Sequence, residues 1–333
     1  MMADAVSVSV SAPLPSEVGK TFIRVVEVWV PGNDRSLLEF SAGLYGSASR
    51  FGALSRQMCF GRGEGLPGQA WEEGRPIVLK QFEGSTFRRT KAAEAEGLTC
   101  GIALPIFAGD FLTAVLVIFC GDDEEHAGAI ELWCNDPAAS KDMTLADGYY
   151  GSTADAFEFI SRRTAFRKGN GLPGMAWESG LPVFIEDLGK GAGFLRADSA
   201  VKVGINRGFA IPCSTPGETA HVLAFLSALA TPIVRRFETW LPFGQGHAEC
   251  LYRSGGFCEA TGTVSEAGGD DFIERGQGCL GRAFISGVPA LGGAAASEPG
   301  AVGAAARTAG LQSLVALPVL RAGRLVAVVA WYF

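Results

Sequence analysis

The sequence carries little charge and has no cluster of basic residues. Charged residues make up 19% of its 333 positions, the formal net charge is -7, and the 28 Lys and Arg residues are scattered along the chain. A protein that binds nucleic acid through its phosphates concentrates basic residues on one surface. Nucleic acid is therefore not expected as a partner.

Long apolar segments are missing as well. The longest, residues 113–120 and 222–234, fall short of the ~20 residues that a membrane helix needs. Residues 1–20 lack the basic start and apolar middle of a signal peptide. We therefore expect a protein of the cytoplasm that makes no contact with a membrane.

Metal ligands and catalytic pairs are sparse. The sequence has 3 His and 8 Cys, and no two cysteines form a Cys-x-x-Cys pair. Such cysteines fit reduced thiols in a protein core better than a disulfide framework or a zinc site. No histidine stands at a recognisable spacing from a nucleophile. The sequence therefore predicts no catalytic residue and no metal site, and it assigns no cofactor.

What the sequence has instead is an internal repeat. The pattern Gly-Leu-Pro-Gly-x-Ala-Trp-Glu-x-Gly-x-Pro occupies residues 65–76, returns at 171–182, and returns in a weaker form at 278–289, in steps of 106 and 107 residues. A Glu-x-Trp pair recurs at nearly the same spacing, and its glutamates are Glu27, Glu131 and Glu238. A repeat of this period indicates a domain-sized unit copied three times.

The residue pattern of each copy predicts the same order of elements: an antiparallel hairpin, a short helix, a short strand and a pair of apolar strands. In the first hairpin Glu27 and Trp29 share one face, because side chains alternate along a strand. Gly74 is expected to end the helix in a left-handed conformation. In the first copy the predicted elements fall at residues 25–30 and 37–42, 69–72, 76–79, and 101–108 with 111–119. The third copy repeats the last strand pair at 313–320 and 325–331.

These features resemble the GAF domain, a small-molecule-sensing module of bacterial signalling proteins. The similarity lies in residues 63–76 and 169–182, followed by a late Gly-x7-Pro element and the last strand pair. It is strong in copies one and two and weak in the degenerate third copy. The resemblance implies an α+β fold in which each module has a central antiparallel sheet with short helices and loops on one face. The expected divisions are a tail at 1–22 and modules at 23–120, 121–228 and 229–333.

The linkers between the copies are too short for the helices that usually flank a GAF sheet, so we expect flanking helices to be reduced or absent. An uncovered apolar face would cost roughly 25 cal/mol per Å². We therefore expect the three sheets to pack together around a pseudo-threefold axis. In this hypothesis neighbouring modules share the strand 112–119 or its equivalents, and the strand 325–331 closes against 25–30.

The resemblance also implies a ligand pocket under the loops of copies one and two. The pair Phe87 and Arg89 recurs as Phe194 and Arg196. An arginine beside an aromatic ring can hold a carboxylate or phosphate through two parallel hydrogen bonds. The alternative is a surface arginine with a ring that fixes the loop. The predicted ligand-binding residues are Tyr45, Trp71, Phe87, Arg89, Tyr150, Trp177, Phe194 and Arg196.

Some of these residues have a second interpretation. Trp71 and Trp177 fit core residues that hold the short helix to the sheet, and Phe284 takes their place in copy three. The three glutamates of the Glu-x-Trp pairs could bind a ligand amine. We expect instead that each pairs with a backbone group or with an arginine across a module interface.

Three modules fill the chain from residue 23 onward, so we expect any output to act through a partner protein. The first hypothesis is a sensor or regulatory adaptor, not an enzyme, in which copies one and two bind a small ligand, with an anion as one option. The second is a ligand-free scaffold for protein association. The third, implied by reductases built on the GAF fold, is a thiol-based methionine sulfoxide reductase acting through Cys59 or Cys100. The sequence leaves open the ligand, the partner and the formation of a homo-oligomer.

Overall fold

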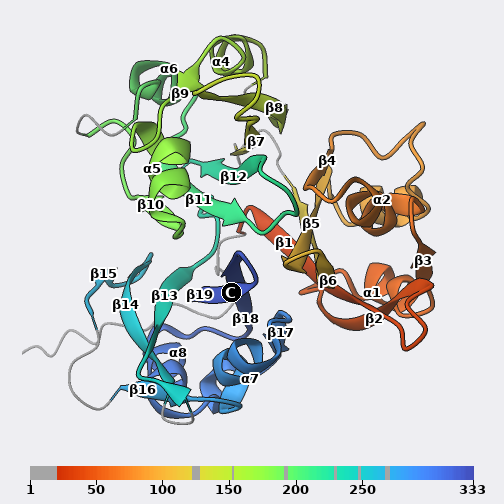
Figure 1. Ribbon diagram of the computed structural model, residues 1–333, viewed down its shortest axis with the longest axis vertical. Helices are drawn as coiled ribbons and strands as arrows, with labels where there is room; N and C mark the ends of the chain where they lie inside the picture. The colour runs from red at the N-terminus through yellow and green to blue at the C-terminus, as the bar shows by residue number, and fades with distance from the viewer. Residues whose placement is uncertain are drawn as a thin grey trace, which may run out of the picture.

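The computed structural model describes residues 21–121, 128–151, 154–190, 194–228, 231–246, 249–266 and 271–333. Within them the chain forms three antiparallel sheets that follow one another in the sequence and surround a common centre (Figure 1). Short helices cover the outer face of each sheet. The expected α+β modules are confirmed, whereas residues 1–20 of the expected tail lie outside the described residues.

The first sheet has the strand order β3-β2-β1-β6-β5-β4. Its strands in chain order are β1 (Ile23–Pro31), β2 (Leu37–Leu44), β3 (Cys59–Gly61), β4 (Ile77–Leu79), β5 (Cys100–Ala108) and β6 (Phe111–Cys120). Its helices are α1 (Ser49–Ser55), α2 (Gly65–Glu73) and α3 (Thr90–Ala95). The predicted first hairpin and last strand pair are confirmed, as β1 with β2 and β5 with β6.

The second sheet repeats this plan with the order β10-β11-β12-β7-β8-β9. Its strands are β7 (Gly128–Asn135), β8 (Met143–Tyr149), β9 (Ala165–Phe166), β10 (Val183–Ile185), β11 (Arg207–Cys213) and β12 (Ala220–Ser227). Its helices are α4 (Ala154–Ser161), α5 (Gly171–Ser179) and α6 (Ala197–Lys202).

The third sheet has the order β15-β14-β13-β19-β18-β17, and β16 also pairs with β14. Its strands are β13 (Arg236–Phe243), β14 (Cys250–Cys258), β15 (Gly262–Val264), β16 (Phe272–Glu274), β17 (Ala290–Gly292), β18 (Leu314–Arg321) and β19 (Arg324–Tyr332). Its helices are α7 (Gly278–Ser286), the 3₁₀ helix η3 (Ala295–Ser297) and α8 (Gly300–Ala309).

The repeated Gly-Leu-Pro-Gly motif is the start of a helix, not only a turn before one. Helix α2 begins at Gly65, four residues before the predicted helical turn. Pro67 is tolerated in its first turn, because backbone N–H groups there have no partner within the helix. Gly74 ends the helix with φ 63°, as predicted. The motif needs glycine at position 68, since a Cβ atom there would lie 2.1 Å from the carbonyl oxygen of Gly61.

The inner faces of the three sheets form one central core. It contains Ile102 and Leu104 of β5, Phe225 of β12, and Leu317 and Trp331 of the third sheet. Strand β5 is buried along almost its whole length, because alternate side chains face this central core and the first module's own core. The expectation that the sheets pack against one another is confirmed, and it explains why these strands read as unbroken apolar runs.

The predicted sharing of strands between modules is wrong. Strand β6 pairs with β1 and β5 of its own sheet, and β19 pairs with β13 and β18, not with β1. Side chains make the contacts between sheets instead, such as the rings of Phe184 and Phe237, whose centres lie 4.4 Å apart. The physical reason is that every central strand already has two hydrogen-bonded neighbours, so its edges offer no free backbone groups.

Candidate functional site

A buried carboxylate lies at the centre of the first module. Glu27 on β1 is 0% exposed. Its oxygens accept hydrogen bonds from both terminal nitrogens of Arg89, at 2.6 and 3.1 Å. Two further donors reach the same carboxylate: Trp29 Nε1 at 3.1 Å and the Tyr45 hydroxyl at 3.2 Å. Arg89 also donates to the Ser55 hydroxyl. The charge of Glu27 is therefore neutralised and its oxygens are well supplied with donors.

The second module repeats this network residue by residue. Arg196 donates to both oxygens of Glu131, at 2.5 and 2.8 Å, and also to the Ser161 hydroxyl. Trp133 Nε1 and the Tyr150 hydroxyl each donate to the carboxylate at 3.0 Å. Burial alone would raise the pKa of Glu131, but the charge and hydrogen bonds of Arg196 outweigh it and the pKa is lowered. Burial and the charge of Glu131 raise the pKa of Tyr150, so its phenol stays protonated and donates.

The third module keeps the buried carboxylate but pairs it differently. Glu238 accepts from Arg236 on its own strand at 2.5 and 3.1 Å, and Arg253 on β14 lies 3.5 Å away. Trp240 Nε1 donates at 3.1 Å, and the hydroxyl of Tyr332 on β19 donates at 2.7 Å. Both arginines come from the sheet here, and none comes from a loop over it.

The two arginines that were predicted to bind a ligand instead pair with glutamates of the protein itself. Arg89 and Arg196 are each 4% exposed, although the sequence offered a solvated surface arginine as the alternative. The three glutamates do pair with arginines, but the expected position across a module interface is wrong. Each pair lies within one module. In the first two modules the loop before α3 or α6 folds back over the sheet and brings Arg89 onto Glu27, 62 positions away, whereas in the third module Arg236 lies on the same strand as Glu238.

The predicted aromatic residues fall into two groups. Phe87 and Phe194 are buried in their module cores, and Phe87 stacks on Phe82 with ring centres 4.7 Å apart. Trp71 packs partly buried against the core of the first module. Trp177, its equivalent, packs in the same way against the core of the second module and also lines a cavity between the modules. Ligand binding by the eight residues stays a prediction, and Trp177 is the one among them that the structure brings to this cavity.

The last hairpin turns of the three modules meet beside one another. They are residues 109–110 between β5 and β6, 214–219 between β11 and β12, and 322–323 between β18 and β19. A Cβ atom at Gly323 would lie 3.4 Å from the backbone nitrogen of Gly109, which shows how closely the first and third turns approach. The longer second turn contacts the strands next to both other turns, at Phe107 and at Leu320.

Ser214 makes the contacts that join the turns. Its carbonyl oxygen accepts a hydrogen bond from Phe107 N of the first module at 3.3 Å. Its hydroxyl donates to Leu320 O of the third module at 2.5 Å and accepts from Leu320 N at 3.1 Å. One residue of the second module therefore fixes the position of both other turns.

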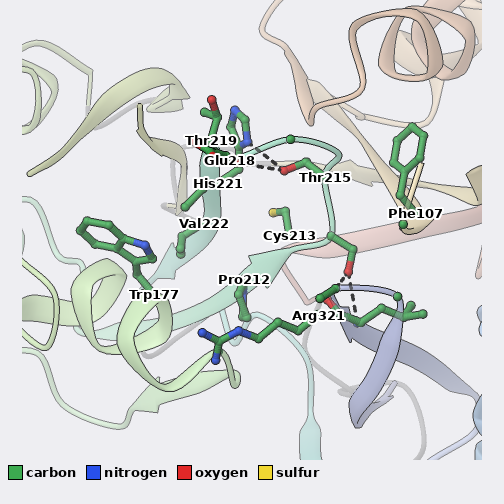
Figure 2. A pocket seen from close by; sticks show the side chains of 18 of the residues that line it. Phe107, Trp177, Pro212, Cys213, Thr215, Glu218, Thr219, His221, Val222 and Arg321 are labelled. Carbon is green, nitrogen blue, oxygen red and sulfur yellow. Dashed lines mark hydrogen bonds between the residues drawn. The ribbon is translucent and has the colours of Figure 1, made fainter. Parts of the chain in front are cut away.

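A cavity of about 270 Å³ opens at this junction. Figure 2 shows Trp177 on one side of it and Phe107 on the opposite side, with Pro212 and Cys213 on strand β11 between them. Arg321 extends from the third module across the cavity toward the second. A molecule in this space would touch all three modules.

The charged groups of the cavity are two cations and one acid. Lys168 lies with its Nζ 4.9 Å from the centre of the Trp177 ring, and Arg321 and Glu218 also line the space. In the described part of the chain none of the three takes part in an ion pair. The local charge balance is therefore positive, which favours an anionic ligand.

A neutral imidazole completes the wall. His221 at the start of β12 is 8% exposed, and its Nδ1 lies 3.3 Å from the Thr215 hydroxyl. Burial, assisted by the nearby charge of Arg75, lowers the pKa of His221 to about 4. At neutral pH this ring carries no charge and offers hydrogen bonding only.

The sequence alone does not reveal this cavity. A signal for it was present, because the second turn has residues 214–219 between strands where the other modules have 109–110 and 322–323. An insertion at one position of a regular repeat often carries function. The sequence does not show which residues of the other modules line this cavity, because that depends on how the three sheets pack.

The described residues offer little for metal or thiol chemistry. No group of three or more His, Cys, Asp or Glu side chains among them is placed to hold a metal ion. Cys59 is exposed on the edge strand β3, whereas Cys100 is buried on β5. None of the helices in the described ranges has the length and apolar character of a membrane span.

Several solved structures are similar to parts of this chain. The GAF domain of A. aeolicus nlh2 in an inactive state is 22% identical, over 31% of this chain and 60% of that one, with a TM-score of 0.25. A Staphylococcus aureus NreA protein mutated in its nitrate-binding site is 17% identical, over 30% and 74%, with a TM-score of 0.25. The reduced form of Staphylococcus aureus fRMsr is 21% identical, over 31% and 58%, with a TM-score of 0.24.

No protein-family model and no curated protein matches the chain. The resemblance of its modules to GAF domains lies in their own features: a central antiparallel sheet, short helices on one face and the repeated Gly-Leu-Pro-Gly helix. What the cavity can bind follows from its own residues.

Proposed function

We propose that this protein is a GAF-type regulatory protein that binds a small molecule in the cavity between its three modules. The observation that carries the proposal is the meeting of three equivalent turns at one cavity of about 270 Å³. Ligand sites commonly have ~300–1,000 Å³ and lie where domains meet. The smaller volume of this cavity favours a compound that is smaller than a nucleotide.

Binding at this position has a route to a regulatory effect. The ligand contacts Phe107, Trp177 and Arg321, which belong to three different modules. Its affinity therefore depends on how the modules are arranged, and by reciprocity its binding favours one arrangement. The inner faces of the sheets share one packed core, which transmits small shifts of one module to the others. In this proposal a partner protein in the cytoplasm reads the arrangement, and the protein itself catalyses no reaction.

A thermal-shift screen with small metabolites tests the proposal, because a ligand that binds the folded state raises the melting temperature. Thr219→Trp places a large ring at the wall of the cavity and is expected to abolish the shift. Thr261→Trp adds the same ring at the exposed turn between β14 and β15, away from the cavity, and is expected to preserve it. Compounds that shift both variants equally would show that the cavity is not the site.

A second candidate function is a ligand-free scaffold for protein association. It is favoured by the buried ion pairs that occupy the cores of modules one and two at Glu27 and Glu131. A crystal structure grown from cell-purified protein separates the two functions, since ordered density in the junction cavity supports the sensor and a solvent-filled cavity supports the scaffold.

The reductase alternative rests on Cys59, because this thiol is exposed and Cys100 is not. A methionine sulfoxide reductase assay of the wild type and of Cys59→Ser tests it. Activity that disappears in the variant would make the protein an enzyme.

A further inference from the structure

We infer that the ligand of the junction cavity is a small anion held jointly by Lys168 of the second module and Arg321 of the third. This inference rests on the proposed function and specifies the chemistry of its site. It assigns binding to two residues of different modules, neither of which belongs to the buried networks at Glu27 and Glu131.

Both cations approach the end of helix α5. The Lys168 ammonium lies over the ring of Trp177 at 4.9 Å. The guanidinium of Arg321 packs against Gly180 at the end of the same helix, where a Cβ atom would lie 2.9 Å from Arg321 Nη1. Gly180 thus leaves the space through which Arg321 reaches the second module, as Figure 2 shows by its direction toward Trp177.

The positive charge at this end of the cavity is not held in an ion pair. Lys168 and Arg321 are both exposed, and in the described ranges neither has an ion-pair partner. An anion between Lys168 and Arg321 would be attracted by both charges at once.

The remaining walls narrow the chemistry of the ligand. Trp177, Pro212 and Val222 supply apolar surface, whereas Thr215 and the neutral His221 supply hydrogen bonds without charge. A guanidinium holds a carboxylate or a phosphate through two parallel hydrogen bonds. The site therefore fits a small organic acid with a compact apolar body. Glu218, beside His221, would exclude a second negative charge at the other end of the molecule.

Pairs of compounds that differ in charge but not in shape test this inference. Calorimetric titrations would compare acetate with acetamide and benzoate with benzamide. At least one acid is expected to bind at least about tenfold tighter than its amide. Lys168→Gln and Arg321→Gln are each expected to weaken that acid by about tenfold. Arg324→Gln removes the same charge from the same hairpin without lining the cavity, and it is expected to leave the affinity within about threefold.

Hydrogen exchange locates the bound acid. Binding is expected to slow amide exchange in residues 214–219 and 321–323 together, because one molecule would bridge the two turns. If acids and amides bind equally well and neither Lys168→Gln nor Arg321→Gln changes the affinity, the inference that the ligand is an anion is wrong. The proposed function would still stand. A panel in which no compound binds, or binds without protecting these turns, would overturn both. All three substituted side chains are exposed, so unchanged melting temperatures are expected to show that the variants fold.

Discussion

The second and third modules solve the same problem in different ways. Each buries a glutamate of its first strand at 0% exposure beside a tryptophan that donates to it. The second module neutralises Glu131 with Arg196, which comes from a loop over the sheet. The third neutralises Glu238 with Arg236 from the same strand, and Arg253 of β14 stands nearby.

Both modules place an arginine beside the buried carboxylate, but they draw it from different parts of the chain. In the second module the ion pair also fastens the loop before α6 to the sheet. In the third module the corresponding region is η3 and α8, which are held through apolar contacts of Ala295, Val302 and Ala306. An ion pair that fastens a loop should therefore matter more to stability than one made within a sheet.

The largest effect is expected for Arg196→Met. The substitution leaves Glu131 buried without its cation, and removing one partner of a buried pair costs ~3–5 kcal/mol. The free energy of unfolding, measured by urea denaturation, should fall by that amount. The double variant Glu131→Gln, Arg196→Met should recover part of the loss, because no uncompensated charge remains. An unchanged midpoint in Arg196→Met would contradict the role given to this pair.

The next largest effect is the pH dependence of stability that His221 causes. Ala327 occupies the position in the β18–β19 ladder that corresponds to His221 in the β11–β12 ladder. Its folded pKa of about 4 lies below the ordinary value of 6.5. The unfolded chain therefore binds a proton at His221 more readily than the folded chain does. The stability that the neutral ring contributes is complete above pH 6.5 and is lost as the pH falls toward 4. The loss reaches at most ~3 kcal/mol.

The variant His221→Ala makes this position of the second module like that of the third. Its stability should depend less steeply on pH than that of the wild type between pH 6.5 and 4. Urea denaturation at several pH values measures the two slopes. Parallel slopes would show that His221 is not held neutral by the fold.

A smaller effect is expected for Arg236→Met in the third module. Arg253 lies 3.5 Å from the same carboxylate and can supply the missing charge, so the loss should be ~1–3 kcal/mol. The double variant with Arg253→Met should lose more than the sum of the two single variants. A loss as large as that of Arg196→Met would remove the distinction between the modules.

The sequence predicted the modules well because its signals are local. The Gly-Leu-Pro-Gly motif depends on contacts such as that between Gly68 and the carbonyl group of Gly61, which lie within one module and few residues apart. The alternation around Glu27 and Trp29 placed both on one strand face, and the structure brings Trp29 Nε1 onto the carboxylate. The end of α2 at Gly74 followed from the conformations that glycine tolerates.

The predictions that were wrong depended on distant contacts. Apolar strands such as β6 indicate burial on both faces, but burial does not tell whether the neighbour is hydrogen-bonded or packed through side chains. The arginine opposite Glu27 could be placed in its own module only once the loop was seen folded over the sheet. The junction cavity needed both kinds of information, because Lys168 and Arg321 are far apart in the sequence and meet through the packing of two sheets.

The smallest effect is expected for Ser214→Ala, which tests the long turn that the second module has and the third lacks. The substitution removes both hydrogen bonds between the Ser214 hydroxyl and the backbone of Leu320, and it leaves the carbonyl contact with Phe107 in place. The global free energy of unfolding should fall by only ~1 kcal/mol, because the backbone groups of Leu320 at this partly open site can turn to water. Local hydrogen exchange at Leu320 should nevertheless rise clearly, while exchange in β7 and β13 stays unchanged. Slow exchange at Leu320 in the variant would mean that the side-chain core alone holds the turns together, and that Ser214 does not join them.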